Sequence, residues 1–368
     1  MTVTKCVEKL IELTRDLILI PSTATNPEER DRCFEFTKNH IERLENIHLR
    51  EYRNNGIPSL VALPNNCQIP KILLCAHLDV IGHPDLSCYR SSIVDGRIYG
   101  PGAGDMKGAL AILLELFRDF HCRDPNASLG LVITSDEETG GRFGIQYLVD
   151  EMELRCGVAL IPDGGSLNEI VIEEKGIIHL HVRCHGQAAH AARPWLGVNP
   201  LQCLIDGLNK LHDHFDSLRQ DNGTWYPTCT VTVMDTPNTT INRIPTMAEG
   251  QLDIRFPPPH TTESIMATIK EILGQEVECR IIISAEPTRQ PSDPLFVSIT
   301  EGILDEKPIL SRTDAGSDAR FFSRRGIPAI ISSPLVGNLH SEQEWIDIQS
   351  METFYRIYER YITKKLNV

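Results

Sequence analysis

Short apolar runs alternate with longer helical patterns in the first and last parts of the chain. Runs with the length of a buried strand occur at 71–76 (KILLCA), 129–135 (LGLVITS), 157–161 (GVALI) and 328–332 (PAIIS). Helical patterns occur at 106–121, 140–152 and 350–364. Because this strand–helix rhythm is typical of a sheet covered on both faces, we predict a mainly parallel α/β domain.

The middle of the chain has a different pattern. Residues 177–184 alternate, with Ile178, Leu180, Val182 and Cys184 on one face. Further elements are expected at 199–214 (helix), 228–234 and 248–255 (strands), 262–273 (helix) and 276–284 (strand). This β-α-β-β-α-β order predicts a ferredoxin-like α+β domain at 177–285, inserted into a discontinuous domain of residues 1–176 and 286–368. The exposed face of such a small domain is a natural dimerisation surface, so we expect a homodimer.

Composition narrows the class of protein. The 368 residues are 41% hydrophobic and 23% charged, with a formal net charge of −14, which argues against a nucleic-acid or anionic-membrane partner. No run of about 20 apolar residues occurs, and the charged N-terminal pattern is not that of a secretory signal. The 11 cysteines are scattered and form no C-x-x-C, which favours reduced thiols in a cytoplasmic protein.

Acidic residues and histidines follow the predicted buried strands. They are His77 and Asp79 after the first strand, Asp136, Glu137 and Glu138 after the second, Asp163 after the third, and His340 after the last. Asp105 lies in a Gly-rich turn, YGPGAGDMKG, just before a predicted helix. Because ligands of open parallel sheets bind outside the carboxyl ends of the strands, we expect at least four of these groups at one rim.

Imidazole and carboxylate groups without cysteine are ligands of catalytic zinc, manganese or cobalt. The number of carboxylates exceeds the need of one ion, and suits two ions about 3.5–4 Å apart that share one carboxylate. Each residue alone has a plainer interpretation, such as a helix cap for Asp105 or a solvated turn for Glu137 and Glu138. Five elements that each place such a residue at one sheet edge favour a site for two divalent metal ions.

Several motifs together resemble a known family. The motifs are HLD, GAGDMKG, SDEETGG, PDGG, HGQAAHAARPWLGVNP, GSDARF and GNLHSEQEW, and in this order they cover nearly the whole chain. They are similar to those of the di-zinc amidohydrolases and peptidases that include acetylornithine deacetylase, succinyl-diaminopimelate desuccinylase, aminoacylase and carboxypeptidase G. The resemblance implies two zinc ions, with cobalt or manganese as alternatives.

The resemblance also assigns the ligands. It implies that His77 and Asp163 bind one ion, that Glu138 and His340 bind the other, and that Asp105 bridges them, followed by a cis peptide bond to Met106. It gives Asp79 the role of hydrogen-bonding the far nitrogen of His77. Glu137 is then the general base, which takes a proton from the metal-bridging water and passes it to the leaving amine.

In the inserted domain, the resemblance implies that His190 reaches the active site of a partner subunit and helps to hold the carbonyl oxygen. Asn242 in NRIP and Arg255 in DIRFP are expected to face the substrate carboxylate, and Arg320 in GSDARF is a further candidate. The plainer interpretation of a lone surface Arg is a solvated side chain. His179, His181 and His185 are expected on an exposed strand face.

The predicted reaction is hydrolysis of the amide bond of a small N-acyl amino acid, and GSDARF favours the desuccinylase side of the family. A dipeptidase or carboxypeptidase on the same two metals is the alternative. A non-catalytic binding protein would lack a ligand or Glu137, and all are present; no G-x-S-x-G supports a serine hydrolase. Pro101, where the family usually has Arg, and segment 83–92 depart from the family pattern beside the site, where they bear on substrate preference.

Overall fold

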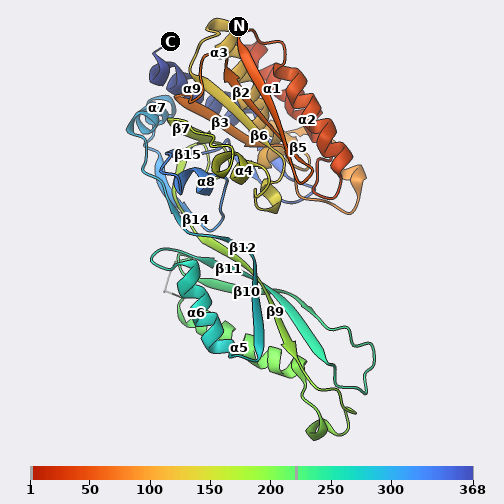
Figure 1. Cartoon of the computed structure of the whole chain (residues 1–368). Helices are drawn as coiled ribbons and strands as arrows, with labels where there is room; N and C mark the ends of the chain where they lie inside the picture. The colour runs from red at the N-terminus through yellow and green to blue at the C-terminus, as the bar shows by residue number, and fades with distance from the viewer. Residues whose placement is uncertain (1–2, 220–222, 368) are drawn as a thin grey trace. The chain divides into compact units, whose positions relative to one another are not determined.

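The computed structural model describes residues 3–219 and 223–367, which form two compact units. Unit 1 comprises Met1–Ile172, Arg289–Thr313 and Ser317–Val368, and unit 2 comprises Glu173–Thr288 with Asp314–Gly316 (Figure 1). The second unit is thus an insertion in the first. Its expected role in dimerisation stays a prediction.

The large sheet has nine strands in the order β1-β2-β6-β3-β7-β15-β8-β13, with β14 paired to β8. Their bounds are β1 Ile47–Asn54, β2 Ile57–Pro64, β3 Ile72–His77, β6 Leu129–Thr134, β7 Val158–Ile161, β8 Glu169–Glu174, β13 Thr288–Arg289, β14 Ile309–Thr313 and β15 Ala329–Ile331. The central strands β6, β3, β7 and β15 are parallel, and β2 and β8 pair antiparallel at their flanks. The predicted α/β class is confirmed, with antiparallel additions that the apolar runs did not indicate.

Both faces of the large sheet are buried. Alternate residues of β3 belong to different cores: Ile72, Leu74 and Ala76 to one, Leu73 and Cys75 to the other. Helices that contribute to the first core are α1 Val3–Ile18, α2 Pro27–Ile41, α3 Gly108–Arg123, α7 Pro294–Leu304 and α9 Ile348–Leu366, and those of the second are α4 Ile145–Asp150 and α8 Ala319–Ser323. A strand covered on both faces is apolar throughout, which is why these strands could be predicted.

Two predicted helices are shorter than expected at their N-terminal ends. The helix predicted at 140–152 is only α4, because Gly140 and Gly141 adopt φ values of 100° and 65°, outside the helical region. The helix predicted at 106–121 begins as α3 at Gly108, after the turn Ala103–Lys107 that carries Asp105. We call Ala103–Lys107 the Asp105 turn.

A small antiparallel sheet has the order β16-β17-β5-β4. Its strands are β4 Ser92–Val94, β5 Arg97–Tyr99, β16 Val336–Gly337 and β17 Trp345–Asp347. The connection from β16 to β17, residues 338–344, carries His340 and is called the His340 loop below. His340 is therefore carried by a loop of this small sheet. The other candidate ligands follow strands of the large sheet or lie just before α3.

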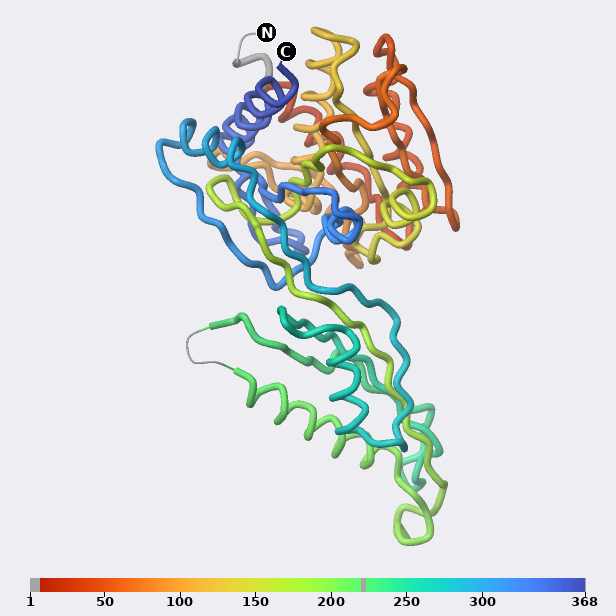
Figure 2. Tube along the Cα trace, turned by 60° about the vertical axis from the view of Figure 1, so that its left-hand side comes forward, coloured from red at the N-terminus to blue at the C-terminus, as the bar shows by residue number. Residues whose placement is uncertain are grey.

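Unit 2 has an antiparallel sheet in the order β10-β11-β9-β12, the ferredoxin-like arrangement that was predicted. Its elements are β9 Gly176–His185, α5 Pro200–Ser217, β10 Thr228–Asp235, β11 Met247–Phe256, α6 Thr262–Leu273 and β12 Val277–Ala285. Helices α5 and α6 lie side by side on one face (Figure 2). Ile178, Leu180, Val182 and Cys184 of β9 belong to the core beneath them. On the other face, His179 and His181 pair with Asp253 and Glu249 of β11.

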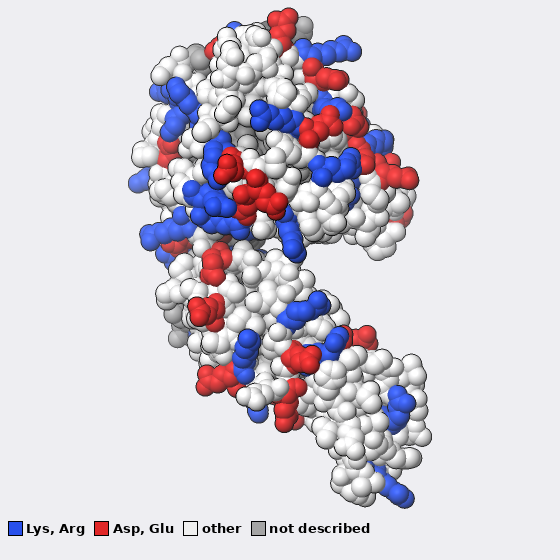
Figure 3. Space-filling view, viewed as in Figure 1, with Lys and Arg blue, Asp and Glu red and all other residues white. Residues whose placement is uncertain are grey.

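Charged side chains of both signs are interspersed on the face of unit 1 seen in Figure 3. Within residues 3–219 and 223–367, no helix combines the length and the apolar character needed to cross a membrane. The ten cysteines with described side chains are all free thiols.

Candidate metal centre

The ends of two adjacent parallel strands deliver the first candidate ligands. His77 is the last residue of β3, and Asp163 follows β7, which pairs with β3 in parallel. Strand β6 lies on the other side of β3 and leads into Glu137 and Glu138. Because parallel strands end at one edge, residues far apart in the sequence meet there, as expected from the order of strands.

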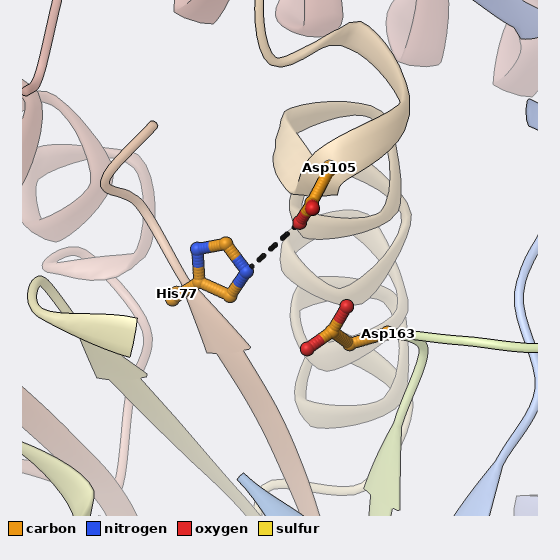
Figure 4. Close-up of side chains that lie close together, drawn as sticks. All are labelled: His77, Asp105 and Asp163. Carbon is orange, nitrogen blue, oxygen red and sulfur yellow. Dashed lines mark ion pairs between the residues drawn. The ribbon is translucent and has the colours of Figure 1, made fainter. Parts of the chain in front are cut away.

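One group of possible metal ligands consists of His77, Asp105 and Asp163, whose ligand atoms all lie within 4.8 Å of one another. Figure 4 shows the His77 ring at the end of β3 facing Asp105, with the Asp163 carboxylate beside them. His77 Nε2 is 3.1 Å from Asp105 Oδ1. Both atoms are buried, and among the described residues neither has a hydrogen-bond partner beside this ion pair, an arrangement that suits a shared cation.

A second group consists of Asp105, Glu138 and His340, with ligand atoms again within 4.8 Å of one another. His340 Nε2 is 3.1 Å from Asp105 Oδ2 and 3.6 Å from Glu138 Oε2. Glu138 Oε1 is buried and has no hydrogen-bond partner within the part of the chain that the structure describes. Asp105 thus belongs to both groups, with one oxygen toward each histidine, which is the position of a bridging carboxylate.

The pKa values of the two groups indicate an excess of negative charge in a buried place. Burial and the charge of Asp105 raise the pKa of Glu138 to about 8 and hold the pKa of Asp163 well above its ordinary value. The hydrogen bond to Asp105 raises the pKa of His340 to about 9. The three carboxylates of the two groups thus lie close to one another with only two histidines to balance their charge. Their nitrogen and oxygen donors fit one or two divalent cations, which would relieve this repulsion.

Asp79 does not make the hydrogen bond that was predicted for it. Its main-chain oxygen, not its carboxylate, contacts His77 Nδ1 at 3.1 Å, and the nearest carboxylate oxygen is 3.6 Å away. The carboxylate instead accepts the main-chain amides of Glu137 at 3.2 Å and Glu138 at 3.0 Å. The side chain is engaged by these amides, so it orients the glutamate pair while its main chain orients the His77 ring.

Glu137 lies beside the two groups and is largely buried, with its side chain 13% exposed. Its Oε1 is 4.0 Å from Nη2 of Arg320, whose guanidinium also stacks on Phe321. The Asp105–Met106 peptide bond is cis, as the family resemblance implied. The structure therefore brings Glu137 and Arg320 to the rim that holds the candidate ligands.

In unit 2, the structure brings His190 and Asn242 together. His190 pairs with Arg243 in an isolated bridge, and the Ala191 amide donates to the main-chain oxygen of Asn242 at 2.9 Å. The Ala192 amide donates to His190 Nδ1 at 3.0 Å, so the neutral ring carries its proton on Nε2. Both His190 and Asn242 are exposed, and His190 presents a hydrogen-bond donor to its surroundings.

Arg255 lies elsewhere, near the other end of β11. It forms a two-pronged ion pair with Asp253, at 2.8 Å from Nε and 3.0 Å from Nη2. His179 shares the same carboxylate, and these partners hold the pKa of Asp253 below its ordinary value against the opposing effect of burial. Arg255 is thus already paired within its own unit, and its contact with a substrate stays a prediction.

Two buried charged residues close to the rim were not found from the sequence. Glu344 is 2% exposed and accepts the main-chain amides of Gly104 and Asp105 at 2.8 and 2.7 Å. Lys107 is fully buried, donates to the main-chain oxygen of Ile20, and has its pKa lowered to about 8 by burial. Lys107 lies in the motif GAGDMKG and Glu344 in GNLHSEQEW. No local sequence pattern distinguishes a buried Glu or Lys from an exposed one.

Comparison with known proteins gives the same grouping as the motifs. Residues 73–364 match the sequence profile of peptidase family M20/M25/M40. Over 326 residues the chain is 30% identical to a succinyl-diaminopimelate desuccinylase of Rickettsia rickettsii (strain Sheila Smith), covering 81% of this chain and 84% of that protein.

Solved structures share the fold at low sequence identity. An M20 family metallo-carboxypeptidase, Sso-CP2, from Sulfolobus solfataricus has a TM-score of 0.81 and 17% identity, over 98% of this chain and 100% of that chain. Human carnosine dipeptidase 1 has a TM-score of 0.75 and 15% identity, over 100% and 98% of the two chains. The chain therefore belongs to peptidase family M20/M25/M40, and it is a metal-dependent hydrolase of amide bonds.

Proposed function

We propose that this protein removes the acyl group from a small N-acyl amino acid by hydrolysis at a centre of two zinc ions. The observation that carries the proposal is the position of Asp105 between two ligand groups. His77 and Asp163 would hold one ion, Glu138 and His340 the other, and Asp105 both. When bound, the ions would polarise the scissile carbonyl and lower the pKa of the attacking water.

Glu137 is the general base of this proposal. It neighbours Glu138 in the chain, and Asp79 accepts the main-chain amides of both residues, which fixes the backbone that carries the two carboxylates. Glu137 takes a proton from the attacking water and gives it to the leaving amine. Arg320, 4.0 Å from Glu137, would hold a negative group of the substrate next to the base.

The acyl group is the least constrained part of the substrate. The similarity to a desuccinylase supports an N-acyl amino acid with an acidic acyl group. A dipeptidase or carboxypeptidase with the same residues is the second candidate, favoured by the similar fold of a carboxypeptidase and a dipeptidase.

The geometry of unit 2 supports a homodimer in which His190 serves the partner's site. Arg255 lies at the C-terminal end of β11, whereas Asn242 and His190 lie beyond its N-terminal end. From Met247 to Arg255 the strand rises about 27 Å at about 3.4 Å per residue. A small substrate is much shorter, so it contacts both ends only if two subunits contribute them.

A free sheet edge offers a surface for this homodimer. Strand β10 is the outermost strand of its sheet, and its Val231, Val233 and Met234 are 42–44% exposed. An unpaired edge with apolar side chains is suited to pairing with a second copy of the same strand.

The first experiment is hydrolysis of a small panel by zinc-loaded protein, with Glu137→Gln as the blank. The panel holds N-succinyl-diaminopimelate, N-acetyl-ornithine, other N-acyl amino acids and simple dipeptides. Cleavage of an N-acyl amino acid by the native protein alone supports the proposal. Cleavage of dipeptides alone transfers it to the second candidate, and no cleavage with two ions bound refutes both.

The dimer proposal has its own test. Inactive His190→Ala and Glu137→Gln proteins are mixed and allowed to exchange subunits. Because one site of the mixed dimer has an intact His190 and an intact Glu137, about a quarter to a half of the native activity should return. If mixed dimers form and no activity returns, His190 does not act across the dimer.

A further inference from the structure

One buried carboxylate joins the two chain segments that carry Asp105 and His340. Glu344 ends the His340 loop, and its Oε1 accepts the amides of Gly104 and Asp105 from the Asp105 turn. Its Oε2 accepts the amide of His340 itself, at 3.3 Å. The turn and the loop are more than 230 residues apart in the sequence, yet a single side chain receives donors from both.

Close packing between the same two segments is a separate observation. A Cβ atom added to Gly104 would lie 2.8 Å from Leu339 Cδ2 and 2.9 Å from Val336 Cβ. It would also lie 3.2 Å from the main-chain oxygen of Trp345. Since real Cβ contacts are rarely so short, the His340 loop and its flanking strands rest directly on the backbone of the Asp105 turn. The turn and the loop therefore form one docked assembly.

We propose that Glu344 is a positioning residue that sets the spacing between Asp105 and His340, and so the affinity of their ligand group for its metal ion. This inference rests on the proposed two-metal function. Glu344 touches no reacting atom; it acts through the main chains of the two ligands. None of the motif residues assigned a role above performs this task.

The two ligand groups depend on Glu344 to different extents. The group of Asp105, Glu138 and His340 takes two of its three members from the docked assembly. The group of His77, Asp105 and Asp163 takes one, and its other two members come from the ends of β3 and β7. Loss of Glu344 would leave the main-chain amides of Gly104, Asp105 and His340 without this acceptor and free the His340 loop. The group of Asp105, Glu138 and His340 should therefore lose more affinity than the group of His77, Asp105 and Asp163.

The test is calorimetric titration of metal-free protein with Zn²⁺. Glu344→Ala should weaken one of two binding events by about tenfold to a hundredfold, the range for residues that orient metal ligands, and change the other by less than about threefold. Glu342→Ala is the matched control, because it removes an exposed glutamate from the same loop. It should leave both events unchanged.

Glu344→Gln provides a second variant in case the alanine protein does not fold. Glutamine keeps one oxygen for the amides of Gly104 and Asp105, but it turns an amino group toward the His340 amide. In the metal-free protein, we expect hydrogen exchange of the amides of residues 104–105 to be as slow in this variant as in the native protein. The binding event that Glu344→Ala weakens should still lose affinity. A purely structural role would predict no loss of affinity in this variant.

The His340→Ala background identifies the affected group. If Glu344 acts through His340 and its ligand group, adding Glu344→Ala to His340→Ala should cost little further affinity. Equal weakening of both binding events, or unchanged binding in both Glu344 variants, overturns the proposal. Native protein that binds fewer than two ions refutes the two-metal function instead, so the two failures are distinct.

Discussion

The two ligand groups share Asp105 but are built in different ways. His77 is 1% exposed and stands on a strand that is buried along its whole length. His340 is 53% exposed and stands in a loop, with a φ of 63°. The first group is thus held by the large sheet, whereas the second depends on how a loop docks. We call the group of His77, Asp105 and Asp163 the rigid half and the group of Asp105, Glu138 and His340 the docked half. The comparison teaches that one metal centre can combine a half held by a sheet with a half that needs its own support.

The largest effect is expected from Asp105, which both halves share. Asp105→Ala should abolish tight binding of both ions, because each group falls to two ligands, and activity should fall below detection. Metal content after gel filtration and the rate of hydrolysis measure this. Asp95→Ala, on an exposed turn, is the control. Retention of one tightly bound ion would show that the halves are independent.

Glu137→Gln should separate chemistry from metal binding. Loss of a general base lowers kcat by about a hundredfold to ten-thousandfold. Glu137 is in neither ligand group, so the variant should still bind two ions with native affinity. The kinetic constants and the metal content are measured on one preparation. A variant that loses an ion would make Glu137 a ligand and require a different base.

The two histidines should differ in what they contribute to folding. In metal-free protein, His77→Ala breaks a buried pair with Asp105 and should cost about 3 kcal/mol of unfolding free energy. His340→Ala removes a half-exposed pair and should cost less than about 1 kcal/mol. Denaturant unfolding in EDTA measures both. Equal costs would contradict the division into a rigid and a docked half.

The smallest effect is expected from a change of pH on the stability of the metal-free protein. Glu138 and His340 have pKa values raised to about 8 and about 9, so the folded metal-free protein binds more protons than the unfolded chain between pH 6.5 and 8. The stability that these groups confer is present at the acid end of this window and is lost as the pH rises. The melting temperature in EDTA should therefore fall from pH 6.5 to 8.

Two controls sharpen this last prediction. Glu138→Gln should flatten the pH dependence of the melting temperature, since it removes one of the groups that titrate across this window. Metal-saturated protein should show no such fall, because metal binding displaces the same protons. A melting temperature that rises across the window in EDTA would contradict the assigned direction.

The rigid half was the easier half to predict from the sequence. Buried parallel strands are apolar throughout, so the polar residue at the end of each strand, such as His77 or Asp163, is conspicuous. Strand β1 escaped notice because it is charged and none of its residues is fully buried, with the sequence IHLREYRN. Strand β2, with the sequence IPSLVALP, is as apolar and buried as the predicted strands and was missed all the same. His340 was also found from its place after the last predicted strand, but the structure puts it in a loop of the small sheet and not at the end of a strand of the large one.

Contacts between distant segments account for what the sequence did not show. The Asp79 carboxylate binds amides 58 and 59 residues away, and nothing in H-L-D indicates that these would be closer than the ring of His77. Glu344 looks like the exposed Glu342 in the sequence, and only the packing of its loop on Gly104 distinguishes the two. Such pairings depend on tertiary structure, which local patterns do not encode.

The separation in sequence between the ligands bears on biosynthesis. His77, Asp105 and Asp163 all leave the ribosome within the first 163 residues, whereas His340 and Glu344 follow some 180 residues later. At about 5–20 residues per second, translation needs roughly 9–36 s to cover that interval. Throughout it, the nascent chain already contains all the ligands of the first group and only two of the second. The group of His77, Asp105 and Asp163 is therefore complete in the nascent chain well before the group of Asp105, Glu138 and His340.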